Sequence, residues 1–350
     1  MKILLCSWAN IFEPEINYAF KKMGFTVDEL ISFITDPFSD SNYIRILSDK
    51  LLTNTYAFVF SVNYIPIVTM VCTIHKIKYI SWIADSPCFE LNSYSISSPY
   101  NYIFIFDKIL FDNYYTESPD TVYYLPLGSN VARLDNIVLT NEENINYKSD
   151  ISFVGSLYTF RSKYNNLYRF DKRNHIIDNF IGRECSHRER IRIINRLCKE
   201  FSFDLYTNDD TSYNPGIKNN GIVDPIVEVF KVYKATKINL NITSKTIKSG
   251  LPLRLFDIMG SGGFLITNYQ SELSDYFEIN KDLVVYENSD DLVNKISYYL
   301  SHEDERLEIA YNGYTKVKTK HQFTNRICKI LSFEHTKYEF LIFCVFISIN

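Results

Sequence analysis

The sequence predicts an α/β protein with two similar units, each a parallel sheet covered by helices. Short apolar runs alternate with helical patterns through both halves of the chain, which is typical of strand–helix–strand folds. Residues 129–149 are polar and irregular, and we expect them to link the halves. The chain has 350 residues, of which 46% are hydrophobic and 22% charged, so each half can bury a core of its own.

The first unit is expected over residues 1–128. Its predicted strands cover residues 3–6, 25–30, 57–61, 79–84, 102–106 and 122–125. Helices are expected at 15–23, where Gly24 ends the helix, in a stretch that ends near residue 75, and at 107–116. This alternation predicts parallel strands whose carboxyl ends point toward a ligand crevice.

The second unit is expected over residues 150–331. Its predicted strands cover residues 150–155, 203–206, 237–241, 264–267 and 283–286. Helical patterns lie between them, including an arginine-rich segment at 188–196, and a last helical stretch covers 303–331. Residues 332–350 could be a final strand, a surface-binding segment or an aberrant tail. Two such units predict a cleft, although the architecture alone fits sugar transferases, epimerases and binding proteins.

Composition argues against several classes of protein. A net charge of −4 with scattered Lys and Arg disfavours a nucleic-acid surface. The seven cysteines have no CxxC or metal-finger spacing, which indicates reduced thiols in the cytoplasm. No apolar run is long enough to span a membrane, and the first ten residues predict a strand rather than a signal peptide. We expect no bound metal and no dinucleotide cofactor, because the motifs for both are missing.

The stretch SGLPLRLFDIMGSGGFLITNYQSEL, which begins at Ser249, carries the strongest chemical signal. Pro252 suits a helix start, and the backbone amides of such a turn favour an anion. Arg254 could then bind a phosphate with two parallel hydrogen bonds, and Asp257, one turn later, could accept from two ribose hydroxyls. Alternatively, Arg254 and Asp257 form an exposed ion pair that contributes only tenths of a kcal/mol. The residues alone leave both interpretations open.

Two more strand ends in the second unit are candidates for binding. Gly155 and Ser156, in SFVGSLY, follow a predicted strand, and a glycine there would let a ligand approach the backbone. The alternative is an ordinary turn. Tyr206, in FDLYTN, ends another strand and could contact a base or a sugar, or could belong to a solvated loop.

In the first unit, Asp85 is the candidate catalytic residue. It follows the strand in YISWIADSP, where a carboxylate could take a proton from an acceptor hydroxyl or amine. A turn aspartate before Ser-Pro is the alternative. In the second unit, Asn239 and Asn241 of KINLNITS are expected to form a buried hydrogen-bond network, because buried amides require partners.

Several motifs occur together in the order known from one family. KYISWIADSP, YYLPLGSN, DISFVGSLY, FIGRE, KINLNIT and the stretch that begins at Ser249 resemble the CgeB-like, or spore-maturation-protein-like, glycosyltransferases of the GT-B superfamily. The resemblance extends to about residue 331. It implies two Rossmann-like domains that face each other across a cleft, with a nucleotide sugar bound mainly by the C-terminal domain and no need for a metal.

The resemblance also implies roles for individual residues. By position, Arg254 would contact the diphosphate, and Asp257 would hold the ribose where many relatives have the longer Glu. Ser249 stands where related retaining enzymes carry another Glu. Gln270 and Glu272 lie where the loop of relatives faces the donor sugar.

The function expected from these observations is the transfer of a hexosyl or N-acetylhexosaminyl group from a UDP-linked donor. The acceptor is a protein, glycan or small molecule that the sequence does not identify. One alternative is a GT-B-type nucleotide-sugar epimerase. Another is a non-catalytic nucleotide-sugar-binding or spore-coat protein, because the loop SWANIFEPE lacks the glycines of many GT-B acceptor loops.

Overall fold

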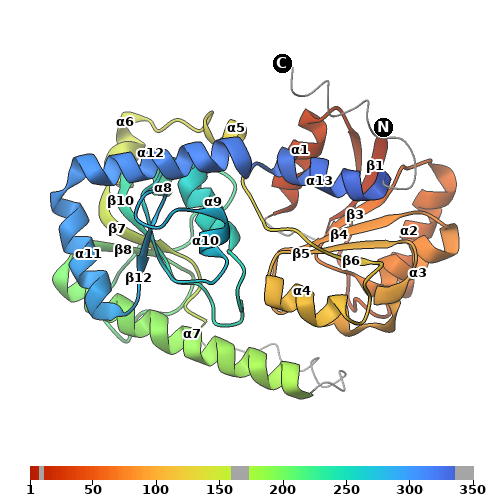
Figure 1. Cartoon of the computed structure of the whole chain (residues 1–350), viewed down its shortest axis with the longest axis horizontal. Helices are drawn as coiled ribbons and strands as arrows, with labels where there is room; N and C mark the ends of the chain where they lie inside the picture. Colours follow the sequence, from red (N-terminus) through yellow and green to blue (C-terminus); the bar gives the residue numbers. More distant parts are fainter. Residues whose placement is uncertain (8–11, 159–172, 336–350) are drawn as a thin grey trace. The chain divides into compact units, whose positions relative to one another are not determined.

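The computed structural model describes residues 1–7, 12–158 and 173–335 (Figure 1), without the side chains of 173–179 and 334–335. The chain folds into two units. The first comprises Met1–Phe106, Leu110–Asn130 and the chain from Lys320 onward, and the second comprises Asp107–Ile109 and Val131–Thr319. This division differs from the expected one after Lys320, where the sequence pattern predicts a continuation of the second unit. Most of the predicted 332–350 tail and part of the SWANIFEPE loop lie outside the described residues.

The first unit contains a six-stranded parallel sheet in the order β2-β1-β3-β4-β5-β6. Its strands are β1 Lys2–Ser7, β2 Thr26–Ile31, β3 Val59–Val62, β4 Tyr79–Ile83, β5 Asn101–Ile105 and β6 Val122–Tyr124. The helices in this part of the chain are α1 Glu13–Lys22, α2 Ser41–Thr53, α3 Pro66–His75, the 3₁₀ turns η1 Phe89–Asn92 and η2 Tyr94–Ser97, α4 Lys108–Tyr115 and α13 Phe323–His335.

Helices cover both faces of this sheet, which explains why its strands are continuous apolar runs. On one face, Leu4 of β1 shares a buried core with Tyr43 of α2 and Val68 of α3. On the other face, Phe20 of α1 packs edge-on against Phe60 of β3, with 5.2 Å between the ring centroids.

The second unit contains another six-stranded parallel sheet, in the order β12-β11-β10-β7-β8-β9. Its strands are β7 Ser149–Val154, β8 Phe203–Tyr206, β9 Lys218–Asn219, β10 Thr236–Asn241, β11 Leu265–Asn268 and β12 Val284–Tyr286. Its helices are α5 Val131–Leu134, α6 Asn141–Asn146, α7 Arg173–Glu200, α8 Glu228–Ala235, α9 Leu253–Gly260, α10 Leu273–Tyr276, α11 Ser289–Ser301 and α12 Glu303–Lys320.

Helices on both faces also enclose the second sheet. Ile194 of α7 and Ile296 of α11 are buried in one core with Phe153 of β7. Helix α8 lies against β7 and β10 on the other face, and α9 packs against α8, β10 and β11. Both sheets confirm the predicted α/β fold class with two parallel, helix-covered units.

The structure differs from the sequence prediction at four places. Residues 129–149, expected to be an irregular linker, contain α5 and α6, and Thr140 forms a capping box with Glu143 at the start of α6. Helix α2 and the two-residue β9 were not predicted. The single helical stretch expected at 303–331 consists of α12 and α13, with a break at His321 and Gln322.

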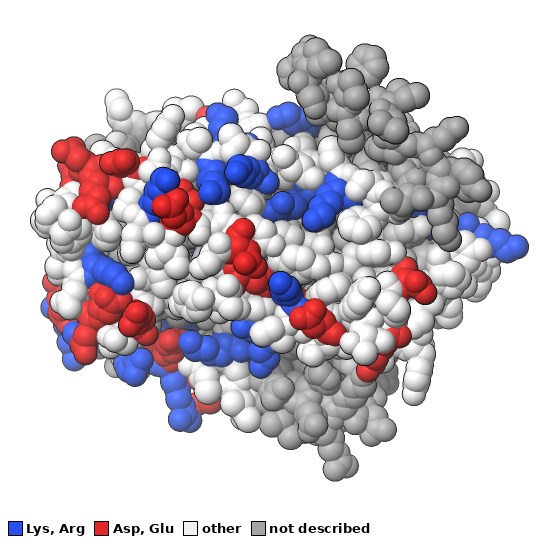
Figure 2. All heavy atoms as spheres, viewed as in Figure 1, with Lys and Arg blue, Asp and Glu red and all other residues white. Residues whose placement is uncertain are grey.

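The described surface carries charges of both signs. Figure 2 shows that acidic and basic side chains both occur across the visible face, without a continuous basic surface. In the described ranges, no helix combines the length and apolar character needed to cross a membrane.

Candidate functional site

The strand order of the second sheet identifies the edge where a ligand is expected. Strands β7 and β10 are neighbours, and the chain continues from them to opposite ends of the sheet. In open α/β sheets, ligands bind at the carboxyl ends of the strands where the order reverses in this way. Gly155 directly follows β7 and Ile242 directly follows β10, so the candidate site lies around these two residues.

Helix α9 places Arg254 against this edge. The helix begins at Leu253, after Pro252, whose extended backbone (φ −69°, ψ 152°) ends the preceding loop. Arg254 lies in the first turn. A Cβ at Gly155 would lie 2.5 Å from its Nη2 atom, and Gly155 has a φ of +150° that other residues rarely adopt. Only glycine therefore gives the guanidinium room to lie on the backbone here.

The contacts of Arg254 with other described residues are made with uncharged groups. Its Nη1 donates to Oδ1 of Asn241 at 3.3 Å, and its guanidinium carbon lies 5.3 Å from the ring centroid of Phe153. The hydroxyl of Tyr233 lies near this guanidinium; burial raises the pKa of Tyr233, although the charge of Arg254 acts to lower it. Among the described residues, no carboxylate forms an ion pair with Arg254. An exposed Arg254–Asp257 pair is therefore not what this arginine forms.

Arg190 of α7 is a second cation at this edge, and sequence reasoning did not single it out. Its side chain is only 2% exposed. It donates to the carbonyl oxygen of Ser156 and, at 2.5 Å, to that of Ile242. Arg190 therefore connects the segment that follows β7 with the segment that follows β10. Its guanidinium carbon also lies 5.3 Å from the Phe153 centroid. Burial lowers the pKa of Arg190 to about 10, so it stays charged at neutral pH.

The turn after Gly155 is held by Asp209. Its carboxylate accepts hydrogen bonds from the hydroxyl of Ser156 at 3.0 Å and from the backbone N–H of Leu157. The Ser156 hydroxyl in turn accepts from the backbone N–H of Tyr158 at 2.9 Å. The Ser156 hydroxyl thus has a structural role in shaping the turn beside Arg254.

The other predicted donor residues form separate groups. Tyr206 is 5% exposed; its carbonyl accepts from the Gly155 N–H at 3.0 Å, and its hydroxyl lies beside Asn220. Ser249 and Glu272 are both buried, and the serine hydroxyl donates to the carboxylate at 2.7 Å. Gln270 is half-buried and its carbonyl accepts from the N–H of residue 273.

The predicted asparagine network of β10 is confirmed. Asn239 donates to the carbonyl of Tyr233 at 3.0 Å. Asn241 donates to the hydroxyls of Thr243 at 3.0 Å and Thr267 at 2.9 Å, which leaves its Oδ1 atom to accept from Arg254. The network therefore fixes the orientation of an amide that orients the guanidinium.

In the first unit, Asp85 lies just beyond the carboxyl end of β4 and is exposed. Asn63, after β3, donates to its carboxylate at 2.7 Å and accepts from its backbone N–H at 3.2 Å. Asn63 adopts a left-handed φ of 60°, which asparagine tolerates better than most residues. Glu90, which the sequence did not suggest, lies nearby: burial and then the charge of Asp85 raise its pKa.

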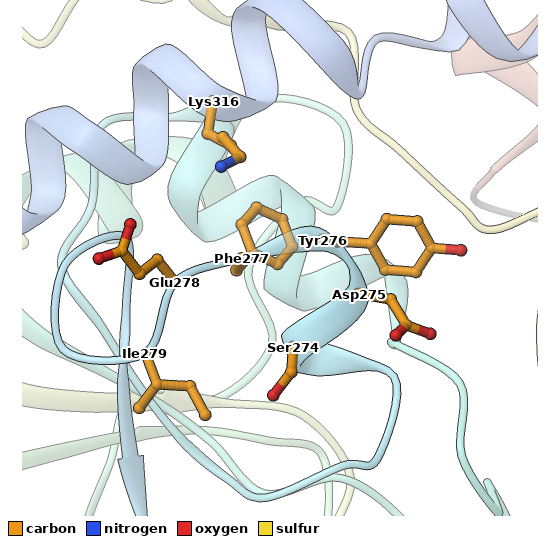
Figure 3. A pocket seen from close by; sticks show the side chains of 7 residues that line it. All are labelled: Ser274, Asp275, Tyr276, Phe277, Glu278, Ile279 and Lys316. Atoms are coloured by element: carbon orange, nitrogen blue, oxygen red, sulfur yellow. The ribbon is translucent and has the colours of Figure 1, made fainter.

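A pocket of about 430 Å³ elsewhere in the second unit contains none of the predicted site residues. Residues 274–279 and Lys316 line it. Figure 3 shows Lys316 reaching from α12 toward this segment, whereas Tyr276 points away to the other side. Lys316 already pairs with Asp282 at 3.3 Å, so its charge is largely compensated.

The fold of this chain is similar to that of several solved structures. A glycosyltransferase from Rickettsia africae matches 95% of this chain over 97% of its own length, with 13% identity and a TM-score of 0.63. HepE from Anabaena in complex with UDP-glucose also matches 95% of this chain, over 99% of its own length, with 10% identity and a TM-score of 0.64. This chain matches sucrose-phosphate synthase from Thermosynechococcus elongatus to a similar extent (98% of that chain, 10% identity, TM-score 0.61). The fold is therefore that of GT-B glycosyltransferases, with two Rossmann-like units.

A family model gives a more local match. Residues 183–332 match the model described as glycosyl transferase-like, and this range includes Arg190, Arg254 and Asp257. No curated protein matches the sequence. The narrower resemblance to CgeB-like proteins stays a prediction.

Proposed function

We propose that this chain is a glycosyltransferase that moves a hexosyl or N-acetylhexosaminyl group from a UDP-linked donor to an acceptor. One observation carries the proposal: the Arg254 guanidinium lies on Gly155 where the strand order reverses, without a described carboxylate to neutralise it. A buried or half-buried cation without a counter-ion is costly unless an anion arrives. The fold and the glycosyl transferase-like match of residues 183–332 support a nucleotide sugar as that anion.

The donor would bind at the carboxyl edge of the second sheet. Arg254 and the amides at the start of α9 would hold the diphosphate, and Asp257 would accept from the ribose hydroxyls. Gln270 and Glu272 would face the sugar. When the bond between the anomeric carbon and the diphosphate breaks, UDP leaves with the electron pair, and the arginine stabilises that charge. In this proposal the reaction needs no metal and no cofactor besides the donor.

The acceptor would be activated in the first unit by Asp85. Its exposed carboxylate, which Asn63 holds in place, would take the proton of the acceptor hydroxyl or amine as that group attacks the anomeric carbon. We place the reaction in the cytoplasm, which the pattern of the cysteines supports.

Calorimetry with UDP, UDP-glucose and UDP-GlcNAc tests the donor site. The proposal predicts binding of UDP by the wild type and much weaker binding by Arg254→Ala; no binding by the wild type would refute it. Product analysis then separates the possible reactions. Free UDP with a glycosylated acceptor is expected, whereas an interconverted nucleotide sugar without acceptor would indicate an epimerase. Binding without donor hydrolysis or transfer would indicate a non-catalytic protein.

A further inference from the structure

Tyr158 lies beside the proposed donor site in an unusual backbone conformation. It follows the turn that begins at Gly155, and its φ is +58°. Bulky residues rarely adopt this left-handed region, and holding one there costs on the order of 1 kcal/mol. The hydrogen bond from its N–H to Ser156, which Asp209 holds in turn, fixes this conformation. The turn thus keeps the tyrosine at the carboxyl edge of β7.

The Tyr158 side chain faces several cations. Its ring centroid lies 4.4 Å from the guanidinium carbon of Arg190, and its hydroxyl lies close enough to Arg190 and Ser244 for both to lower its pKa. Arg254 of α9 and Arg183 of α7 also act on the hydroxyl electrostatically. The phenol oxygen therefore lies where α7 and α9 contribute positive charge, near the segment that follows β10.

Other charged groups lie farther out around this cluster. Tyr286 of β12 faces Arg190, the imidazole of His187 bonds the carbonyl of Leu157 at 2.7 Å, and Lys245 pairs with Glu189 at 3.0 Å. Burial alone would raise the pKa of Tyr158. The charge of Arg190, the nearby hydroxyl of Ser244 and the charges of Arg254 and Arg183 outweigh it and lower the pKa below 10.0. The electrostatic potential at this oxygen thus favours an anion.

We propose that the Tyr158 hydroxyl is a ligand of the donor's phosphates, donating its hydrogen bond to a phosphate oxygen that Arg254 holds, while the buried Arg190 contributes positive charge from the face of the ring. This inference rests on the proposed function, because it requires a phosphate-containing ligand at this edge. Only the neutral phenol can donate the bond. A tyrosinate would neutralise the arginines and repel the phosphate, so binding at high pH must be accompanied by uptake of one proton.

Tyr158→Phe tests the proposal, because it removes only the hydroxyl and keeps the ring over Arg190. At pH 7 it should weaken UDP binding about tenfold, as expected for one hydrogen bond to a charged group. Between pH 7 and 9.5, the affinity of the wild type should fall more steeply than that of the variant, because only the wild type has this phenol to reprotonate. Tyr213→Phe changes a tyrosine that is 50% exposed in the same unit, and it should keep the wild-type affinity and pH profile.

An absorbance titration near 295 nm gives an independent readout. The wild type should show one tyrosine that ionises at a lower pH than the others, and this signal should be missing from Tyr158→Phe. UDP should suppress the signal in the wild type. If the variant binds UDP with the affinity and pH profile of the wild type, the Tyr158 proposal is overturned and the proposed function stands. If the wild type does not bind UDP, the proposed function fails and the Tyr158 proposal fails with it. Thermal unfolding of both Phe variants checks that they are folded.

Discussion

Arg254→Ala removes a guanidinium that α9 holds against Gly155. If Arg254 binds the diphosphate through two charge-assisted hydrogen bonds at a half-buried position, its loss should cost about 2 to 3 kcal/mol of binding free energy. That corresponds to UDP binding about 30- to 150-fold more weakly at 25 °C. The stability of the folded protein should fall by less than the binding free energy does. A hydrogen bond to Asn241 at 3.3 Å and a cation–π contact with Phe153 at 5.3 Å contribute about 1 kcal/mol together, and repulsion from Arg190 is relieved.

Isothermal titration with UDP at low and moderate salt measures this effect. Arg254→Lys keeps the charge but not the planar pair of donors, so it should recover only part of the affinity. Arg196→Ala is the matched control, because Arg196 lies on α7 in the same unit but pairs with Glu200 at 3.1 Å and with Asp290. It should bind UDP like the wild type. If Arg254→Ala also does, Arg254 does not contact the phosphates and the argument fails.

Three further changes test other parts of the account. Gly155→Ala should displace Arg254 and weaken UDP binding at least tenfold, whereas Gly262→Ala, with φ +81° and nothing within 4 Å of its added Cβ, should lower only the melting temperature; equal UDP affinities would contradict the contact. Asp85→Asn should reduce transfer by about 10²- to 10⁴-fold in a product assay and leave UDP affinity unchanged; full activity would exclude Asp85 as the base. Glu90→Gln should raise the melting temperature at pH 7.5 more than at pH 4.5. Burial raises the pKa of Glu90 in the folded state, so its ionisation destabilises the fold increasingly as pH rises from the unfolded pKa through the folded one; a lower melting temperature at pH 7.5 would contradict this.

The order of strands and helices followed from the sequence because helix-covered parallel strands are continuous apolar runs. Helix α2 was missed, although Asp40 before Tyr43 and Leu47 is a recognisable start. The Asp40 side chain accepts from the N–H of Tyr43 at 2.9 Å, and Tyr43 and Leu47 are both buried. The two-residue β9 has no pattern that periodicity could detect. Helices α5 and α6 are short and polar, so composition made them resemble a linker.

The candidate site was predictable only in part. The sequence singled out Arg254 because it opens a helix after Pro252, and Gly155 because it follows a strand. Their contact depends on β7 and β10 being neighbours in the sheet, which is a property of the fold and not of either motif. Arg190 is one of several arginines in 188–196, and its neighbours in sequence pair with carboxylates or face solvent. Only the packing of α7 shows which arginine is buried, and only the left-handed turn shows that Tyr158 faces it.

A crystal structure of the protein with UDP would test the central claim most directly. The account predicts the diphosphate against Arg254 and the backbone of Gly155, at the carboxyl ends of β7 and β10, with the ribose near Asp257. UDP bound elsewhere, for example in the pocket formed by residues 274–279 and Lys316, with Arg254 still bonded to Asn241, would contradict it.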